Sequence, residues 1–106
     1  MASLPFLPLS MPCIDELDKV AIAQAVADGW VGPVGPLINE FEISFADYVG
    51  ASHAVALSSG TAALHLGLKA LDVGPGDTVI VPTLTFAATA FAVTYIGANV
   101  AFVDVE

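Results

Sequence analysis

Positively charged side chains are almost absent from this chain. Its 106 residues include only two basic ones, Lys19 and Lys69, against eleven Asp or Glu, so the formal net charge is −9. Proteins that bind a nucleic-acid backbone neutralise its phosphates with Lys and Arg. The composition therefore argues against nucleic acid as a partner. It also means that any phosphate held by this chain must be bound by backbone N–H groups and hydroxyls.

Cysteine is nearly absent as well. Cys13 has no second cysteine with which to form a disulfide or to share a metal ion. The two histidines, His53 and His65, stand apart in the sequence, and we interpret both as structural and expect no metal site. Residues 1–13 contain no Lys or Arg, which the first part of a secretory signal would carry. We therefore expect a cytoplasmic protein.

Charged residues of either sign are scarce. They make up 12% of the chain, while 57% is hydrophobic, and soluble domains usually carry roughly 25% charged residues. Such a composition is typical of a membrane protein, of a subunit that hides its surface in an oligomer, or of a fragment.

The membrane alternative rests on residues 78–103, an uncharged run that is long enough to cross a bilayer. Pro82 and Gly97 interrupt this run, and threonines add polarity to it. Asp77 and Asp104 flank it, with no Lys or Arg beside them to set a topology. We favour two buried strands with a helix between them and expect no membrane partner, and a small membrane protein stays as an alternative.

The spacing of apolar residues predicts two helices followed by alternating strands and helices. Residues 1–13 are expected to form an extended arm, and residues 29–36 a loop rich in Gly and Pro. The expected elements are helices over 14–27, 36–49 or 37–49, 61–71 and 86–95, and strands over 53–57, 78–81 and 100–105. Phe41, Phe45 and Tyr48 form one apolar stripe that we expect to be core. The order β-α-β-α-β after the two helices predicts an α/β fold with a buried, mainly parallel sheet.

A small hydroxylated corner, Ser58-Ser59-Gly60-Thr61, lies where the first expected strand gives way to a helix. In parallel α/β sheets, ligands bind where strands end and helices begin. Gly60 has no Cβ to keep an anion from the backbone, and the first N–H groups of the helix lack internal acceptors. The corner therefore predicts a phosphate or carboxylate site. The alternative is that Ser59 or Thr61 only caps the helix.

A second feature, Phe86, follows the next expected strand and lies in the stretch of residues 83–89. If the two strands are neighbours, Phe86 offers an aromatic face beside the anion site, which suits a flat aromatic phosphate ester such as pyridoxal phosphate (PLP). The corner is neither a Walker A loop nor a Gly-x-Gly-x-x-Gly dinucleotide motif.

A series of short motifs, in this order along residues 14–106, resembles the N-terminal part of the DegT/StrS-type aminotransferases. These are fold-type I, PLP-dependent enzymes that act mostly on nucleotide-linked keto sugars. The motifs are Asp28-Gly29-Trp30-Val31, Gly35-Pro36, Phe41-Glu42, Phe45-Ala46-Asp47-Tyr48-Val49-Gly50, His53-Ala54-Val55-Ala56-Leu57, Ser59-Gly60-Thr61-Ala62-Ala63-Leu64, Gly74-Pro75-Gly76-Asp77, Thr85-Phe86 and Phe102-Val103-Asp104. Each motif is weak alone, and the ordered set is what carries the resemblance.

The resemblance implies a cofactor site. In such enzymes the Ser-Gly-Thr-Ala corner binds the cofactor phosphate, which here implicates Gly60, Thr61 and Ala62. The aromatic residue of the Thr-Phe motif stacks on the pyridine ring, which here is Phe86.

The resemblance also implies substrates and a partner subunit. Such enzymes move an amino group from an amino acid, usually glutamate, to the keto group of a nucleotide sugar, and they work as homodimers. Their Gly-Trp loop approaches the active site at the dimer interface, which assigns Trp30, Val31 and Gly35 to a substrate or dimer loop.

The lysine to which these enzymes attach the cofactor has no counterpart among residues 1–106, because Lys19 and Lys69 match neither its context nor its position. We assign no catalytic residue to this chain and leave its own enzymatic activity open. We expect residues 1–13 to be an arm and residues 14–106 to be a partial PLP-binding large domain. The isolated chain is expected to be inactive.

Three alternatives stay open beside the aminotransferase. The chain is a non-enzymatic truncated remnant or interaction fragment, it belongs to another fold-type I PLP enzyme, or it is the small membrane protein considered above.

Overall fold

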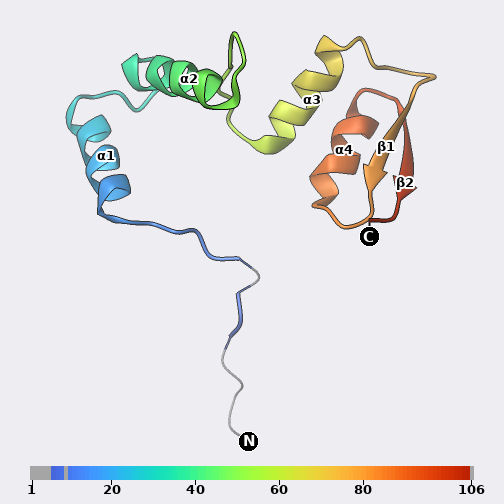
Figure 1. Cartoon of the computed structure of the whole chain (residues 1–106), viewed down its shortest axis with the longest axis horizontal. Coiled ribbons are helices and arrows are strands. Elements are labelled where there is room, and N and C mark those ends of the chain that lie inside the picture. The colour runs from blue at the N-terminus through green and yellow to red at the C-terminus, as the bar shows by residue number, and fades with distance from the viewer. Residues whose placement is uncertain (1–5, 9, 106) are drawn as a thin grey trace, which may run out of the picture. The chain divides into compact units, whose positions relative to one another are not determined.

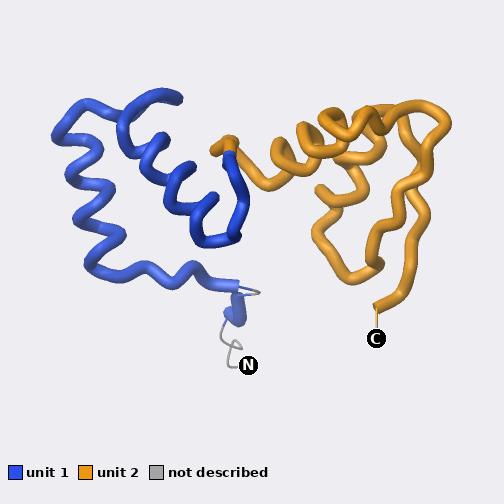
Figure 2. Tube along the Cα trace, turned by 45° about the horizontal axis from the view of Figure 1, so that its top comes forward, with its two compact units in different colours: residues 1–54 blue, residues 55–106 orange. Residues whose placement is uncertain are grey.

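The computed structural model describes residues 6–8 and 10–105, and they divide into two compact units (Figure 2). One unit is Met1–Ala54 and the other is Val55–Glu106. The expected arm falls partly on residues 1–5 and 9, which lie outside the described residues, and its described part has no helix or strand. Among the described residues, no helix is both long and apolar enough to cross a membrane.

The first unit contains α1 (Glu16–Ala27) and α2 (Pro36–Val49) (Figure 1). Asp15 caps α1, because its carboxylate accepts the N–H groups of Leu17 and Asp18 while the Asp18 carboxylate accepts the N–H of Asp15. This capping box fixes the start of the helix at Glu16, later than its apolar spacing implied. The predicted start at Ile14 was therefore two residues early.

The second helix begins at Pro36, the earlier of the two predicted starts, and ends at Val49 as predicted. Pro36 occupies its first turn, where the missing N–H of proline costs nothing, and Gly50 ends it in the left-handed conformation at φ 69°. The aromatic stripe was predicted to be core, and this was wrong for the structure as it stands. Phe41 and Phe45 stack on each other with ring centroids 5.7 Å apart, yet both stay about half exposed.

The second unit contains α3 (Gly60–Ala70), β1 (Thr78–Pro82), α4 (Ala87–Tyr95) and β2 (Asn99–Val103). The strands pair in parallel, with Thr78 opposite Asn99 at one end and Pro82 opposite Val103 at the other. Figure 1 shows α4 between α3 and this sheet, in agreement with the contacts that α4 makes on both sides. The fold is therefore α/β with a parallel sheet, as the sequence predicted.

The core of the second unit lies between α4 and the sheet. Val81 of β1 and Val93 of α4 are each 1% exposed, and Ala98 joins them. Leu68 of α3 packs against this cluster. The core is thus what holds α3 and α4 side by side.

Two predictions about the sheet were wrong. Residues 53–57 are not a strand, because a strand needs a ladder partner and the sheet of the described residues consists of β1 and β2 alone. The boundary between the two units also falls inside this segment. The sheet is not covered on both faces either, since Ile80 and Phe102 are largely exposed.

Candidate cofactor pocket

A pocket of about 450 Å³ lies within the second unit, between the start of α3 and the start of α4. Its lining residues are Gly60, Thr61, Leu64, Phe86, Ala87, Ala88 and Thr89. Three of the residues that the sequence singled out therefore come together. They are Gly60, Thr61 and Phe86, and more than twenty positions separate Phe86 from the other two. Ala62 is not part of the lining.

The start of α3 is organised by Ser59. Its hydroxyl oxygen accepts the N–H of Ala62 at 3.2 Å, so the helix cap that was the alternative interpretation of the corner does exist. The first helical hydrogen bond runs from the N–H of Ala63 to the carbonyl of Ser59 at 3.0 Å. The N–H groups of Gly60 and Thr61 precede it and have no acceptor within the helix. The cap and an anion site are thus compatible, because they use different N–H groups.

Gly60 leaves the corner open. No atom outside its immediate neighbours lies within 4 Å of the place where a Cβ would stand. A ligand can therefore approach the backbone here more closely than it could approach any other residue type.

The start of α4 is organised around Phe86. This residue has an extended backbone, its carbonyl accepts the N–H of Thr89 at 3.0 Å, and its side chain is 79% exposed. The hydroxyls of Thr85 and Thr89 are hydrogen-bonded to each other on either side of it. Phe86 therefore presents a free aromatic face at the pocket from a well-defined turn.

The electrostatics of the pocket come from the backbone. None of the residues that line it carries a charge. Two helices begin there, and the N-terminus of a helix carries about half a positive charge, together with N–H donors. The pocket can therefore attract an anion without a cation, as the shortage of Lys and Arg required.

Sequence reasoning missed some of the lining. Leu64 and Thr89 were not singled out, yet each lies three residues after a predicted site residue, Thr61 and Phe86, on a helix. Residues at this spacing share a helix face. Helical periodicity applied to the two helix starts would have found both.

Neither lysine is among the residues that line this pocket. Lys19 lies on α1 and pairs with Glu16. Lys69 lines a different depression of about 390 Å³, at the other end of α3, together with His65 and Tyr95.

The predicted substrate or dimer loop lies in the first unit. Trp30 packs against Gly35, since a Cβ on Gly35 would stand 2.8 Å from Cε3 of the indole. The backbone N–H of Trp30 donates to the carbonyl of Ala25 at 2.9 Å, which ties the loop to the end of α1. Val31 is 75% exposed.

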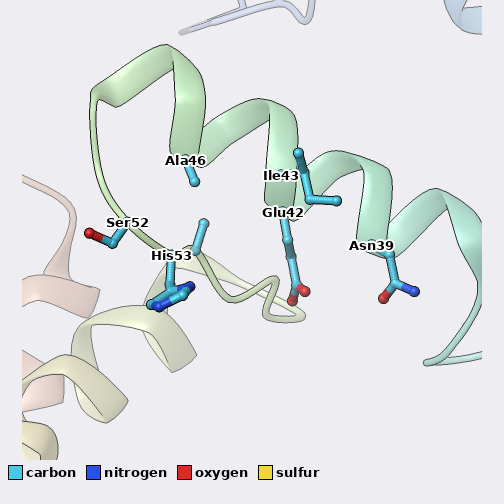
Figure 3. Close-up of a pocket in the computed structure, with 7 residues that line it drawn as sticks. Asn39, Glu42, Ile43, Ala46, Ser52 and His53 are labelled. Atoms are coloured by element: carbon cyan, nitrogen blue, oxygen red, sulfur yellow. The ribbon is translucent and has the colours of Figure 1, made fainter.

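The first unit also holds a hollow of about 370 Å³ beside α2 (Figure 3). Asn39, Glu42 and Ala46 reach it from one face of the helix, and Ser52 and His53 line it from the following segment. It contains none of the predicted cofactor residues. Within the described part of the chain, no three His, Cys, Asp or Glu side chains gather as metal ligands would.

Comparison with known proteins identifies relatives over nearly the whole chain. The family model for the DegT/DnrJ/EryC1/StrS aminotransferases matches residues 12–106. GDP-perosamine synthase of Caulobacter vibrioides is 45% identical over 98% of this chain. The UDP-4-amino-4-deoxy-L-arabinose--oxoglutarate aminotransferase of Shewanella sediminis is 48% identical over 95% of this chain. The matches cover only 28% and 26% of these relatives, so the chain spans about a quarter of their length.

Solved structures agree with the sequence relatives. A protein of Streptococcus pneumoniae named as a sugar aminotransferase, in its PLP form, superposes with a TM-score of 0.81 and 38% identity. The superposition covers 94% of this chain and 25% of that protein. The predicted resemblance and the fold-type I architecture are both confirmed by these matches.

Proposed function

The chain belongs to the DegT/DnrJ/EryC1/StrS aminotransferase family, and we propose that it forms part of the PLP site of an enzyme that aminates nucleotide-linked keto sugars. The observation that carries the proposal is the pocket between the starts of α3 and α4, lined by Gly60, Thr61 and Phe86. The amino donor proposed is glutamate. A relative whose name includes oxoglutarate supports this choice, because oxoglutarate is what glutamate becomes when it gives up its amino group.

The residues of the pocket fit a phosphate ester with a flat ring. The phosphate would lie against the N–H groups of Gly60 and Thr61, where the open Cβ position allows close approach and the Thr61 hydroxyl adds a donor. Phe86 would lie against the ring, because its side chain is exposed at the same pocket. Ala62 would act indirectly, because its N–H holds the Ser59 cap that orients the two residues before it.

The cofactor, when bound, supplies the electron sink that amino transfer requires. The residues of this chain bind and orient it. The two helix N-termini favour the dianionic phosphate, and the Phe86 ring restricts how the pyridine can tilt. No side chain of the pocket can take up or release the proton that the reaction moves, so we assign no catalytic residue here.

We propose further that the loop with Trp30, Val31 and Gly35 contacts the substrate or a second subunit, that the enzyme is a homodimer, and that it works in the cytoplasm. Residues 14–106 would then be part of the cofactor-binding domain. Residues 1–106 alone are expected to be inactive, because neither lysine is among the residues that line the pocket.

The test uses the full product of the gene that encodes this chain. The protein is incubated with PLP, ¹⁵N-glutamate and a panel of nucleotide-linked keto sugars, and the products are analysed by mass spectrometry. We expect ¹⁵N in the sugar and stoichiometric oxoglutarate. The variant Phe86→Ala should bind PLP more weakly, while Phe91→Ala, which removes an aromatic side chain on the same helix outside the pocket, serves as the control.

Two results would contradict the proposal. Sugar that loses a hydroxyl without gaining ¹⁵N would indicate another fold-type I PLP enzyme. A protein that does not bind PLP and does not turn over any of the sugars would be a non-enzymatic remnant.

A further inference from the structure

A second pocket of the second unit lies at the far end of the same two helices. Both α3 and α4 begin at the cofactor pocket, and both end at the depression of about 390 Å³ that Lys69 lines. We call this pocket the Lys69 depression. Its volume lies within the range of roughly 300–1,000 Å³ that is typical of small-molecule sites, and the proposed function does not use it.

The turn that forms one wall of the Lys69 depression is fixed. The carboxylate of Asp77 accepts the N–H of Gly74 at 2.9 Å, and the carbonyl of Asp77 accepts the N–H of Asn99 in β2 at 2.9 Å. Pro75 lies on Gly97, just after α4, since a Cβ on this glycine would stand 3.2 Å from Cγ of the proline. The depression therefore has a defined shape before any ligand arrives.

The wall formed by the two helices is largely apolar. The half-buried His65 of α3 and Tyr95 of α4 lie edge to face, with ring centroids 6.0 Å apart. Val73 and Ile96 pack against the core and add aliphatic surface to the lining. This part of the depression suits the apolar portion of a small ligand.

Two opposite charges line the depression without pairing. Lys69 and Asp72 both belong to the lining, yet within the described part of the chain no ion pair includes either of them. The other lysine, Lys19, does pair, with Glu16. An ammonium and a carboxylate that line one pocket and do not meet each other are free to bind the two opposite charges of a single ligand.

Asp72 stands where an aspartate is unfavourable for two reasons. It follows the C-cap Leu71, where glycine is the usual residue, and its φ of 57° is the one positive value of a residue other than glycine among those that the structure describes. Aspartate tolerates this conformation better than most residues, but at a cost that glycine avoids. The C-terminus of α3 also carries negative partial charge, which repels a carboxylate.

The same helix end favours Lys69, which lies in the last turn of α3. Helix stability therefore accounts for the lysine and does not account for Asp72. A strained residue at the edge of a pocket points to a role in binding.

We propose that the Lys69 depression binds an α-amino acid with an apolar side chain. The ammonium group of the ligand lies beside Asp72 and the C-termini of α3 and α4, each of which carries about half a negative charge. The carboxylate of the ligand lies beside Lys69, and its side chain lies against Tyr95, Val73 and Ile96. This inference goes beyond the proposed function and does not depend on it.

Equilibrium dialysis of the full gene product against radiolabelled L-phenylalanine tests the proposal. The protein is first treated with PLP and borohydride, which reduces a lysine-bound cofactor so that the probe cannot react with it. Hydrocinnamate lacks the ammonium group and phenethylamine lacks the carboxylate, so each should compete with the probe about tenfold less well than unlabelled phenylalanine. Equal competition by either analogue would overturn the proposal, because one charge would then be sufficient.

Lys69→Gln and Asp72→Asn locate the binding. Each variant removes one charge from the depression with little change of shape, and each should weaken the binding of phenylalanine about tenfold. Phenethylamine should lose affinity in Asp72→Asn and keep it in Lys69→Gln. Lys19→Gln is the matched control, because it removes the lysine of α1, and it should leave binding unchanged. Unchanged binding in both Lys69→Gln and Asp72→Asn would overturn the site.

Asp72→Gly separates binding from folding. Glycine adopts a φ of 57° without strain and carries no charge at the helix end, so the variant should unfold at a higher temperature while its affinity for phenylalanine falls about tenfold. A more stable variant with unchanged affinity would overturn the role of the Asp72 carboxylate. If the gene product aminates no sugar, the proposed function fails, and the dialysis experiment still decides whether this site binds an amino acid.

Discussion

The hydroxyl oxygens of Thr85 and Thr89 lie 2.8 Å apart, one before and one after the start of α4. Phe86 sits between them in the sequence, and its carbonyl accepts the N–H of the same Thr89. The two hydrogen bonds hold the turn that contains Phe86, the residue that we place against the cofactor. The orientation of the Phe86 side chain therefore depends on a threonine that makes no stacking contact itself.

Replacing Thr89 by Val should loosen this turn. The change removes the hydroxyl and keeps the shape, so the free energy of unfolding should fall by about 1 kcal/mol, the usual net value of one hydrogen bond. The affinity for PLP should fall with it, since Phe86 loses its fixed orientation. Urea unfolding and PLP titration measure the two effects. Thr89→Ser keeps the hydroxyl and should stay close to the unsubstituted protein, and equal losses in both variants would speak against the hydrogen bond as the cause.

Removing the cap of α3 should destabilise the helix and the corner together. Ser59→Ala leaves the N–H of Ala62 without its acceptor and should lower the free energy of unfolding by about 1 kcal/mol. The neighbouring Ser58→Ala removes a hydroxyl that caps nothing in the described helices and is the control. Thermal unfolding followed by circular dichroism gives the comparison. If both variants unfold at the same temperature, Ser59 does not act as a cap in solution.

A methyl group at position 60 should separate folding from cofactor binding. Gly60→Ala meets no atom within 4 Å and therefore should fold, with α3 at least as stable as before. Its Cβ would nevertheless stand where the phosphate approaches, and a hydrogen bond to a charged group is worth about 1.5–3 kcal/mol, so PLP affinity should fall roughly tenfold or more.

The same helix supplies the control for this experiment. Gly67→Ala also adds a methyl group in open space, toward the other end of α3, and should leave PLP affinity unchanged. Binding is measured by PLP absorbance in the full gene product. Equal affinity in the two variants would show that phosphate does not bind at the corner.

We predict that neither lysine of residues 1–106 takes part in amino transfer. Lys69→Gln in the full gene product should leave kcat unchanged, because Lys69 lies in a depression at the far end of α3 from the cofactor pocket. Residues 1–106 with added PLP should not turn over glutamate. Rate measurements with glutamate test both statements, and a loss of kcat by several orders of magnitude in Lys69→Gln would place this amine at the chemistry.

Local signals in the sequence were sufficient for the helices and for two of the three expected strands. The end of the helix Pro36–Val49 was predicted to the residue and its start to within one residue, because Pro36 and Gly50 mark its ends chemically. The segment of residues 53–57 has the β-branched and apolar character of a strand but does not form one, because pairing depends on a partner that lies elsewhere in the chain. The prediction that the aromatic stripe is buried was wrong for the same reason. The stripe of Phe41 and Phe45 shows which face of α2 is apolar, and it says nothing about what covers that face.

The candidate site could likewise be predicted in part from the sequence. Gly60, Thr61 and Phe86 could be proposed as neighbours from the order of elements, since consecutive βα units place their helix starts at one edge of a parallel sheet. The Ser59 cap was foreseen as an alternative, and the structure has the cap beside an open corner. The contact of Trp30 with Gly35 could not be foreseen, because it depends on the path of a loop whose residues have no periodic pattern.

The uncharged pocket between α3 and α4 has a consequence for its response to acid and base. Its walls are built of Gly, Thr, Leu, Phe and Ala side chains, none of which titrates, and its positive potential comes from peptide groups whose direction is set by the chain. The walls therefore keep the same polarity at every pH at which the protein stays folded. Any pH dependence of phosphate binding would therefore come from the ligand. The second ionisation of a phosphate monoester has a pKa of about 6, which is close to the pH inside cells.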